Sequence, residues 1–365
     1  ELTKVENKDY QYETTLPEGT TSTTLDIETE NKYAKVAVER INSLAYSDTT
    51  SNIKKLSTKK TLDLNSGDNY FKVTVTSENK ETINEYKIKI SVEKPIPLLK
   101  DEIMKNTIIT KTPTLTTTSQ AAGDASGLYK STATNTGEPT YYFRGNVENN
   151  YVSFAGFTWR IIRINEDGTI RIIMTRGINS NTKYKFNSKY NNYTYMYYTN
   201  SEAKTILESW YQTNIGNKLN LASKVASGDY YCEEARVKYR DSSSIENDTM
   251  ILYSNYNPNF KCKIDVNAKG LVNASIGLIT YDEAVYAGSY FEEINDTFYL
   301  KGIMTDTMSP AGFANYNSTI WYLNGSSKAS GASVSGLATY SPVINLKSDI
   351  KASGTGTSSD PFVVE

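Results

Sequence analysis

Residues 141–174 read YYFRGNVENNYVSFAGFTWRIIRINEDGTIRIIM, and the rest of the chain is best understood from this stretch. Aromatic and β-branched residues fill it, which predicts a long β-hairpin whose first arm runs from Tyr151 to Ile164. The turn is Asn165-Glu166-Asp167-Gly168, in which glycine can take the left-handed conformation that such a loop needs, and the return arm runs from Thr169 to Met174. Because apolar residues occupy both faces of the arms, we expect a central strand covered on both sides.

Three arginines interrupt this apolar tract: Arg160, Arg163 and Arg171. Arginine can lay its aliphatic stem along apolar surface while its guanidinium group finds a partner or reaches water. We therefore expect all three to be structural.

Composition excludes several classes of function. The chain of 365 residues is long enough for about two or three domains, and its net charge of −2 provides no field for nucleic acid or an anionic membrane. It contains no histidine, which excludes Ser-His-Asp and Cys-His catalysis and imidazole metal sites, and two cysteines are too few for a thiolate zinc cage. We expect no cofactor and no metal.

No stretch approaches the ~20 apolar residues of a membrane helix, and no signal peptide is visible. The 29 tyrosines, together with abundant Lys, Asn and Ile, are typical of a low-GC bacterium. We expect an extracellular or cell-surface protein whose export signal or anchor has been removed.

The first 94 residues show only strand patterns. The clearest is a hairpin of Tyr70–Thr76 and Tyr86–Val92, in which apolar residues alternate with lysines. This predicts an all-β, Ig-like sandwich for residues 1–94. Two prolines, Pro95 and Pro97, end it, and residues 95–140 are rich in Thr, Ser and Gly, which predicts a linker or extended segment with one short helix between residues 98 and 109.

Residues 141–365 are predicted to form an α+β domain with a central hairpin or sheet, two short helices and long irregular loops. The first helix places Ala203, Leu207 and Trp210 on one face, with Thr199 and Glu202 spaced as a capping box, so Trp210 is expected in the core.

The second predicted helix begins at Thr280, with Glu283 at capping-box spacing, and ends at Gly288. Strands at 342–346 and 361–364 close the domain.

The N-terminal segment resembles a known family. The runs TSTTLDIETENKYAKVAVE and LDLNSGDNYFKVTVTSENKETINEYKIKISV are similar to the cadherin-like β-sandwich repeat of bacterial surface proteins, including its Gly67-Asp68-Asn69 turn before the hairpin. The resemblance covers about 75 residues and implies an Ig-like spacer or adhesive module. The acidic linker residues of a cadherin calcium site are absent from the sequence.

Residues 127–365 resemble an uncharacterised family of surface proteins from low-GC Gram-positive bacteria, some of which begin with a prepilin-like helix. The resemblance rests on the organising tract and on ILESWYQTNI, GLITYDEAVYAG and SPVINLKSDI…SGTGTSSDPFVV, in this order. Members usually carry arginine where this chain has Ser341. The order of elements is also similar to that of C-type-lectin-like and formylglycine-generating-enzyme-like folds.

Cys232 and Cys262 stand 30 residues apart in polar sequence. In an exported protein an even pair predicts one disulfide, with two buried free thiols as the alternative. Carboxylate pairs such as Glu233-Glu234 and Asp282-Glu283 could serve a glycosidase, but they are more simply interpreted as a solvated face and a helix N-terminus.

Aromatic residues are the one surplus. Five tyrosines lie in the polar segment 190–198, and Trp321-Tyr322 follow a predicted loop over 312–319. Rings that stack on sugar faces, together with amides for the hydroxyl groups, make a glycan site. We therefore predict that the two segments converge and that the ligand-binding residues are Tyr195, Tyr197, Asn317, Trp321 and Tyr322, with Trp321 either core or platform.

These observations favour a non-catalytic surface protein, not an enzyme, in which a sandwich stalk presents a Tyr-rich, adhesin-like head. Its expected partner is an extracellular glycan or a host or cell-wall protein. The alternative is a structural segment of a cell-wall or pilus-like assembly without a soluble ligand. An enzyme such as a glycosidase is the third hypothesis.

Overall fold

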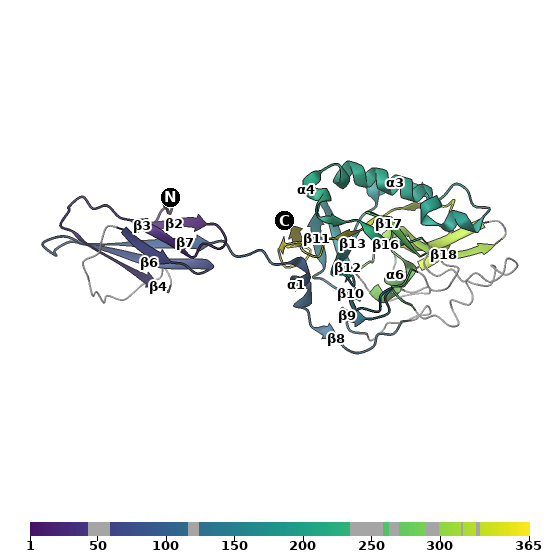
Figure 1. Cartoon of the computed structure of the whole chain (residues 1–365), viewed down its shortest axis with the longest axis horizontal. Coiled ribbons are helices and arrows are strands. Elements are labelled where there is room, and N and C mark those ends of the chain that lie inside the picture. Colours follow the sequence, from purple (N-terminus) through teal and green to yellow (C-terminus); the bar gives the residue numbers. More distant parts are fainter. Residues whose placement is uncertain are drawn as a thin grey trace. The chain divides into compact units, whose positions relative to one another are not determined.

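The structure is a computed structural model that describes residues 1–42, 59–115, 124–233, 258–262, 270–289, 299–314, 317–325 and 329–365. The chain divides into two compact units, Glu1–Ile96 and Pro97–Glu365 (Figure 1). The division falls between the two prolines at which the sequence pattern changes.

The first unit is a β-sandwich. One sheet has the strand order β1-β2-β7-β6-β4, and the other pairs β3 with β5. Its strands are β1 (Thr3–Lys4), β2 (Gln11–Leu16), β3 (Ser22–Asp26), β4 (Lys35–Ile41), β5 (Lys59–Asp63), β6 (Gly67–Thr76) and β7 (Ile83–Val92). The predicted hairpin is confirmed as β6–β7, with Phe71 opposite Ile88. Strand β2 runs parallel to β7 over six residue pairs.

The Gly67-Asp68-Asn69 run, predicted as a turn before this hairpin, is the start of β6, and Asn69 explains its sequence. Its side chain is 1% exposed, and Nδ2 donates to the carbonyl oxygens of Asn65, Gly67 and Ile90 at 2.7, 3.0 and 3.2 Å. Its Oδ1 accepts from the Asn65 N–H at 2.8 Å and from Arg40 Nη1 at 2.9 Å. The Asn69 amide thus closes the loop before β6 and connects this loop to β4 and β7. These contacts require a side chain that has both a donor and an acceptor.

The second unit is built on one large sheet. Its main path is β15-β22-β13-β12-β10-β9-β8, and β11 joins the N-terminal half of β12 to β24 and β23. These strands are β8 (Ile108–Ile109), β9 (Gly127–Ser131), β10 (Thr140–Arg144), β11 (Tyr151–Phe154), β12 (Phe157–Ile164), β13 (Ile170–Met174), β15 (Val225–Ala226), β22 (Val343–Leu346), β23 (Ala352–Ser353) and β24 (Phe362–Val364).

The predicted central hairpin is confirmed as β12–β13, and both closing strands are present as β22 and β24. Strand β13 is buried along its whole length, which fits a strand covered on both faces. The prediction of one continuous arm from Tyr151 to Ile164 is wrong, because Ala155 and Gly156 turn the chain with φ of 55° and 81°. Positive φ at both central residues is the geometry of a tight hairpin turn, so this segment contributes two strands, β11 and β12.

Smaller sheets complete the unit. They contain β14 (Lys183–Lys185) with β21 (Leu337–Thr339), β16 (Gly228–Cys232) with β17 (Leu271–Ala274), and β18 (Met304–Ala314) with β19 (Asn317–Asn324) and β20 (Ala329–Ser333). The described parts of the segment predicted as an irregular loop over 312–319 therefore belong to strands, residues 312–314 to β18 and residues 317–319 to β19. Its turn-like composition misled the prediction, because β18 carries Pro310 at a register irregularity.

The predicted α+β class is confirmed only in part, because the described residues of the second unit are mostly β with few, short helices. In these residues the helices are α1 (Leu99–Met104), α2 (Ile178–Asn181), α3 (Glu202–Tyr211), α4 (Leu219–Ala222) and α6 (Tyr281–Ala287), with 3-10 turns η1 (Tyr193–Met196) and η2 (Tyr198–Asn200) and a π-helical turn η3 (Gln212–Gly216). Figure 1 shows α3 along the outside of the strands of this unit. Within the described residues, no helix is long and apolar enough to span a bilayer.

Of the two predicted capping boxes, one is confirmed and the other is wrong. The capping box of Thr280 and Glu283 is present at α6, and Gly288 ends that helix with φ 116°. At α3, however, the N-cap is Ser201, which accepts from the Lys204 N–H, and the predicted pairing of Thr199 with Glu202 is wrong. Trp210 is buried, as predicted.

The prediction of a linker over residues 95–140 is also wrong for most of its described part. The short helix is present as α1, and its Leu99 and Ile103 are buried in the core of the second unit. Strand β9 pairs along its length with β10. Leu99, Ile103 and Leu128 show that apolar residues spaced among Thr, Ser and Gly anchor the described parts of this segment in the core.

Candidate functional site

The two aromatic segments predicted to converge do lie side by side. The Ser318 N–H on β19 donates to the Tyr190 carbonyl oxygen at 2.9 Å, and Ser318 Oγ donates to the Asn192 carbonyl oxygen at 2.6 Å. Tyr190 itself is 45% exposed.

The exposure of these rings decides which of them could contact a ligand. Trp321 is 2% exposed and stacks on Tyr281 with ring centroids 4.2 Å apart, so it is core, and Tyr197 is 4% exposed. Burial therefore contradicts a ligand-facing role for Tyr197, and of the two alternatives predicted for Trp321, core or platform, the structure shows the core. Tyr195 and Tyr322 are partly exposed, and their role in binding stays a prediction. Asn317 begins β19, but its side chain lies outside the described residues.

Cys232 and Cys262 form a disulfide, as predicted, with their Cα atoms 4.8 Å apart. The bond holds segment 258–262 against the sheet, where Phe260 stacks on Tyr286 at 4.1 Å and its N–H donates to the Ala133 carbonyl oxygen. Glu233 follows directly, is 6% exposed and accepts from the Thr199 N–H, so its interpretation as a solvated carboxylate is wrong. Glu234 lies outside the described residues.

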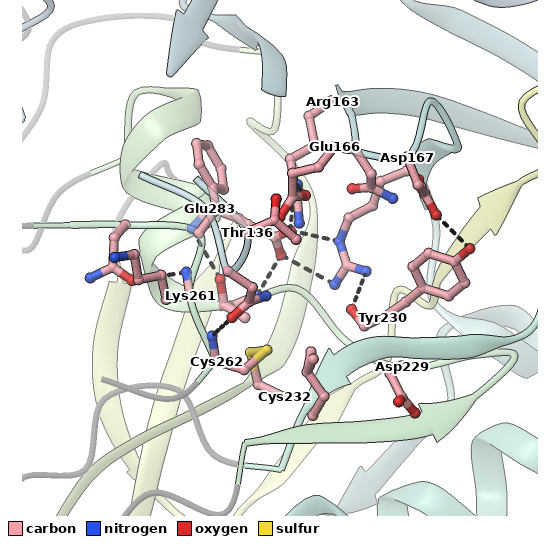
Figure 2. A pocket seen from close by; sticks show the side chains of 17 residues that line it. Thr136, Arg163, Glu166, Asp167, Asp229, Tyr230, Cys232, Lys261, Cys262 and Glu283 are labelled. Carbon is pink, nitrogen blue, oxygen red and sulfur yellow. Dashed lines mark hydrogen bonds and ion pairs between the residues drawn. A yellow bond between two sulfur atoms is a disulfide. The ribbon is translucent and has the colours of Figure 1, made fainter. Parts of the chain in front are cut away.

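Beside the disulfide is a pocket of about 170 Å³, the Glu283 pocket (Figure 2). Glu283 on α6 forms ion pairs with two arginines. Its Oε1 lies 2.6 Å from Arg171 Nε and 3.3 Å from Arg163 Nε. Arg163 also pairs with Glu166 at 3.2 Å. The expectation of paired, structural arginines is therefore met at Arg163 and Arg171.

The two arginines of this pocket favour the ionised form of Glu283. Burial by itself would raise the pKa of Glu283, but Arg171, Arg163 and the Thr280 N–H outweigh it and hold the pKa below its usual value. At the rim, burial and the hydrogen bond to Asp167 raise the pKa of Tyr230 to about 12. The two buried arginines are thus balanced by Glu283 and Glu166, which makes this pocket a structural junction between α6, β12 and β13.

A second site lies around Arg160 at the other end of β12. Two neighbouring hollows of about 790 and 590 Å³ share four lining residues, and we call them together the Arg160 groove. The shared residues are Tyr151, Arg160, Tyr299 and Lys301.

Local backbone geometry forms the walls of this groove. The Ala155–Gly156 turn places Tyr151 on β11 beside Arg160 on β12, which are direct partners in the ladder. Opposite them, residues 179–181 form a left-handed turn with φ of 48°, 58° and 64°. Asn181 stabilises that turn, since its Oδ1 accepts from the Gly177 N–H at 2.7 Å.

The lining of the larger hollow combines three kinds of group. Phe157 and Tyr151 are partly exposed rings, and Asn179, Asn181 and Thr158 contribute exposed amide and hydroxyl groups. Its charged lining residues are all cations: Arg160, Arg176 and Lys301. Glu148 is the one carboxylate that lines the smaller hollow.

Arg160 is 6% exposed, and its hydrogen-bond acceptors are neutral. Nε donates to Asn150 Oδ1 at 2.6 Å and Nη2 donates to the Val147 carbonyl oxygen, while the guanidinium carbon lies 3.7 Å from the Tyr151 ring centroid. Burial lowers the pKa of Arg160. The described residues contain no group of three or more acidic or cysteine side chains that could hold a metal ion.

Sequence reasoning missed this groove. Arg160, Arg163 and Arg171 look alike in the sequence, and only the fold separates the two that reach Glu283 from the one that does not. Residues 179–181 read Asn-Ser-Asn, and the tolerance of asparagine for positive φ is the one signal in the sequence of this special backbone.

Comparison with known proteins assigns only the first unit. Residues 4–93 match the family described as Cadherin-like beta sandwich domain, in agreement with the resemblance of the sequence and with the sandwich of β1–β7. No curated protein and no solved structure matches the chain.

Proposed function

We propose that the protein is a non-catalytic extracellular binding protein, in which the cadherin-like sandwich is a spacer and the unit Pro97–Glu365 binds a glycan in the Arg160 groove. Sandwich domains of this kind are typical of extracellular bacterial proteins. The Cys232–Cys262 disulfide supports the same location, because disulfides persist mainly in oxidising compartments.

The observation that carries the proposal is the lining of the larger hollow. Sugar rings need an apolar ring face for stacking and amide or hydroxyl groups for their own hydroxyls. Phe157, Asn179 and Asn181 supply both kinds of contact along one open surface.

A glycan array probed with the full chain tests this function. Binding of at least one glycan class is expected, and Thr158→Trp, which fills the larger hollow from an exposed strand position, should abolish that binding. Lys130→Trp on β9 is the matched control, because it adds the same ring at an exposed strand position that lines neither hollow. An array without signal, combined with self-association of the chain, would favour the structural role in a wall or pilus-like assembly instead.

A further inference from the structure

The buried arginines of the second unit are not equivalent. Four of them are at most 7% exposed: Arg144, Arg160, Arg163 and Arg171. Arg144 pairs with Asp124 at 3.1 Å, and Arg163 and Arg171 pair with Glu283. Among the described residues, no carboxylate lies within ion-pair distance of Arg160, whose two acceptors are the neutral oxygens of Asn150 and Val147.

A buried charge without a partner is unfavourable, because it has lost water and gained no opposite charge. Arginine stays protonated even when burial lowers its pKa, so the charge cannot be relieved by titration. The remaining amino group, Nη1, has no acceptor in the part of the chain that the structure describes. Since Arg160 lines both hollows, this donor is accessible from the groove.

The surroundings hold the guanidinium group in place and add positive charge. Its carbon lies between two rings, 3.7 Å from the centroid of Tyr151 and 5.4 Å from that of Tyr299. Lys301 lines both hollows with Arg160, and Arg176 lines the larger one. A fixed, planar guanidinium with exposed cations beside it is suited to a carboxylate or phosphate group.

We propose that Arg160 binds an anionic substituent of the glycan, a carboxylate or a phosphate, which supplies the counter-charge that no described residue provides. The proposal rests on the function proposed above and narrows it to acidic polymers. Lys301 and Arg176 contribute longer-range attraction, which salt should screen, whereas the contact at Arg160 is shielded from solvent and should depend less on salt.

The test compares three polymers on the full chain by titration calorimetry: polygalacturonate, the same polymer after its carboxyl groups are reduced to alcohols, and a polyglycerol phosphate. Binding of at least one acidic polymer is expected to be tenfold or more tighter than binding of the reduced one. Comparison of the two acidic polymers identifies whether carboxylate or phosphate is preferred.

Variants then locate the contact. Arg160→Gln should weaken binding of the acidic polymer at least tenfold, and Arg160→Lys, which keeps the charge but not the planar fork, should recover only part of it. Lys301→Gln should weaken binding less and reduce its salt dependence. Lys347→Gln removes one exposed charge outside the groove and should leave binding unchanged. Native tryptophan fluorescence confirms that each variant is folded.

The outcomes are separable. If no polymer binds and the array is also silent, the proposed glycan function fails, and this inference fails with it. If the reduced and acidic polymers bind equally, or if folded Arg160→Gln binds as wild type, the function survives and the anionic site is refuted. The comparison of polymers on the wild-type chain decides the matter even where Arg160→Gln does not fold.

Discussion

At the scale of single residues, Asp306 is a buried carboxyl group whose pKa is shifted in the opposite direction from that of Glu283. It lies on β18 opposite Tyr322 and is 3% exposed, and no salt bridge reaches it among the described residues. Burial therefore raises its pKa well above the usual value. Burial thus favours the neutral form of this carboxyl group, which avoids the larger cost of burying an isolated charge.

This arrangement predicts a pH dependence of stability with a definite sign. The folded pKa of Asp306 is raised, so its contribution to stability is complete below the unfolded pKa of about 3.9 and is lost as pH rises through the folded pKa. Asp306→Asn should remove that loss and make the second unit more stable than wild type at pH 8. Urea unfolding at pH 5 and pH 8 measures it, with exposed Asp349→Asn as the control. Equal pH slopes in wild type and Asp306→Asn would contradict the prediction.

Single residues also show where sequence reasoning reaches its limit. The role of Asn69 follows a local motif, and its partner Asn65 is only four residues away. The burial of Trp321 depends on Tyr281, 40 positions earlier, and nothing local to β19 announces that contact. The aromatic segments could be brought together in prediction, but which rings face water could not.

At the scale of elements, α6 is a helix of seven residues, too short to be stable by itself. Tertiary contacts hold it, since all seven residues are buried and Glu283 connects it to Arg163 on β12 and Arg171 on β13. The ends of α6 were predictable because a capping box and a terminal glycine are local signals. Its ion pairs join residues more than 100 positions apart and were not.

Glu283→Gln should therefore destabilise the second unit by about 3–5 kcal/mol, because it leaves the buried Arg171 without a carboxylate and leaves Arg163 paired with Glu166 alone. Thr280→Ala, which removes only the cap, should cost about 1 kcal/mol. Urea unfolding followed by tryptophan fluorescence measures both in the full chain, since Trp159, Trp210 and Trp321 all lie in this unit.

Glu208→Gln is the matched control for this comparison. Its carboxylate is 44% exposed and pairs with Lys204 one turn away, an interaction worth roughly 0.3–0.5 kcal/mol. Because the folded pKa of Glu283 is lowered, its contribution is present above the unfolded pKa of about 4.3 and is lost as pH falls through the folded pKa. If Glu283→Gln costs no more than Glu208→Gln, the pocket is not the junction described above.

At the scale of the whole molecule, two compact units are joined through Ile96 and Pro97. The fold of the first unit could be predicted from the sequence more completely than that of the second. The sandwich follows from two-residue alternation, a local signal with a single period. In the second unit the large sheet joins strands from residue 108 to residue 364. Its central hairpin was predictable because the two strands are neighbours in the sequence. The pairing of the outer strands, the separate β18–β20 sheet and the Arg160 groove were not. Such pairings depend on distant partners.

The parallel pairing of β2 with β7 has a mechanical consequence. The chain enters the first unit through β1 and β2 and leaves it through β7, so tension between the two ends pulls these neighbouring strands in opposite directions along their own axes. Such a load strains the hydrogen bonds of six residue pairs together instead of one after another. A spacer that holds a bound head against flow would need this resistance.

Single-molecule pulling tests this consequence. Handles at the ends of the unit should give a higher rupture force than handles at Ser66 and Glu93, which flank the open end of the β6–β7 hairpin and load its bonds singly from Gly67 and Val92 onward. Equal forces in the two geometries would show that the β2–β7 ladder does not carry the load.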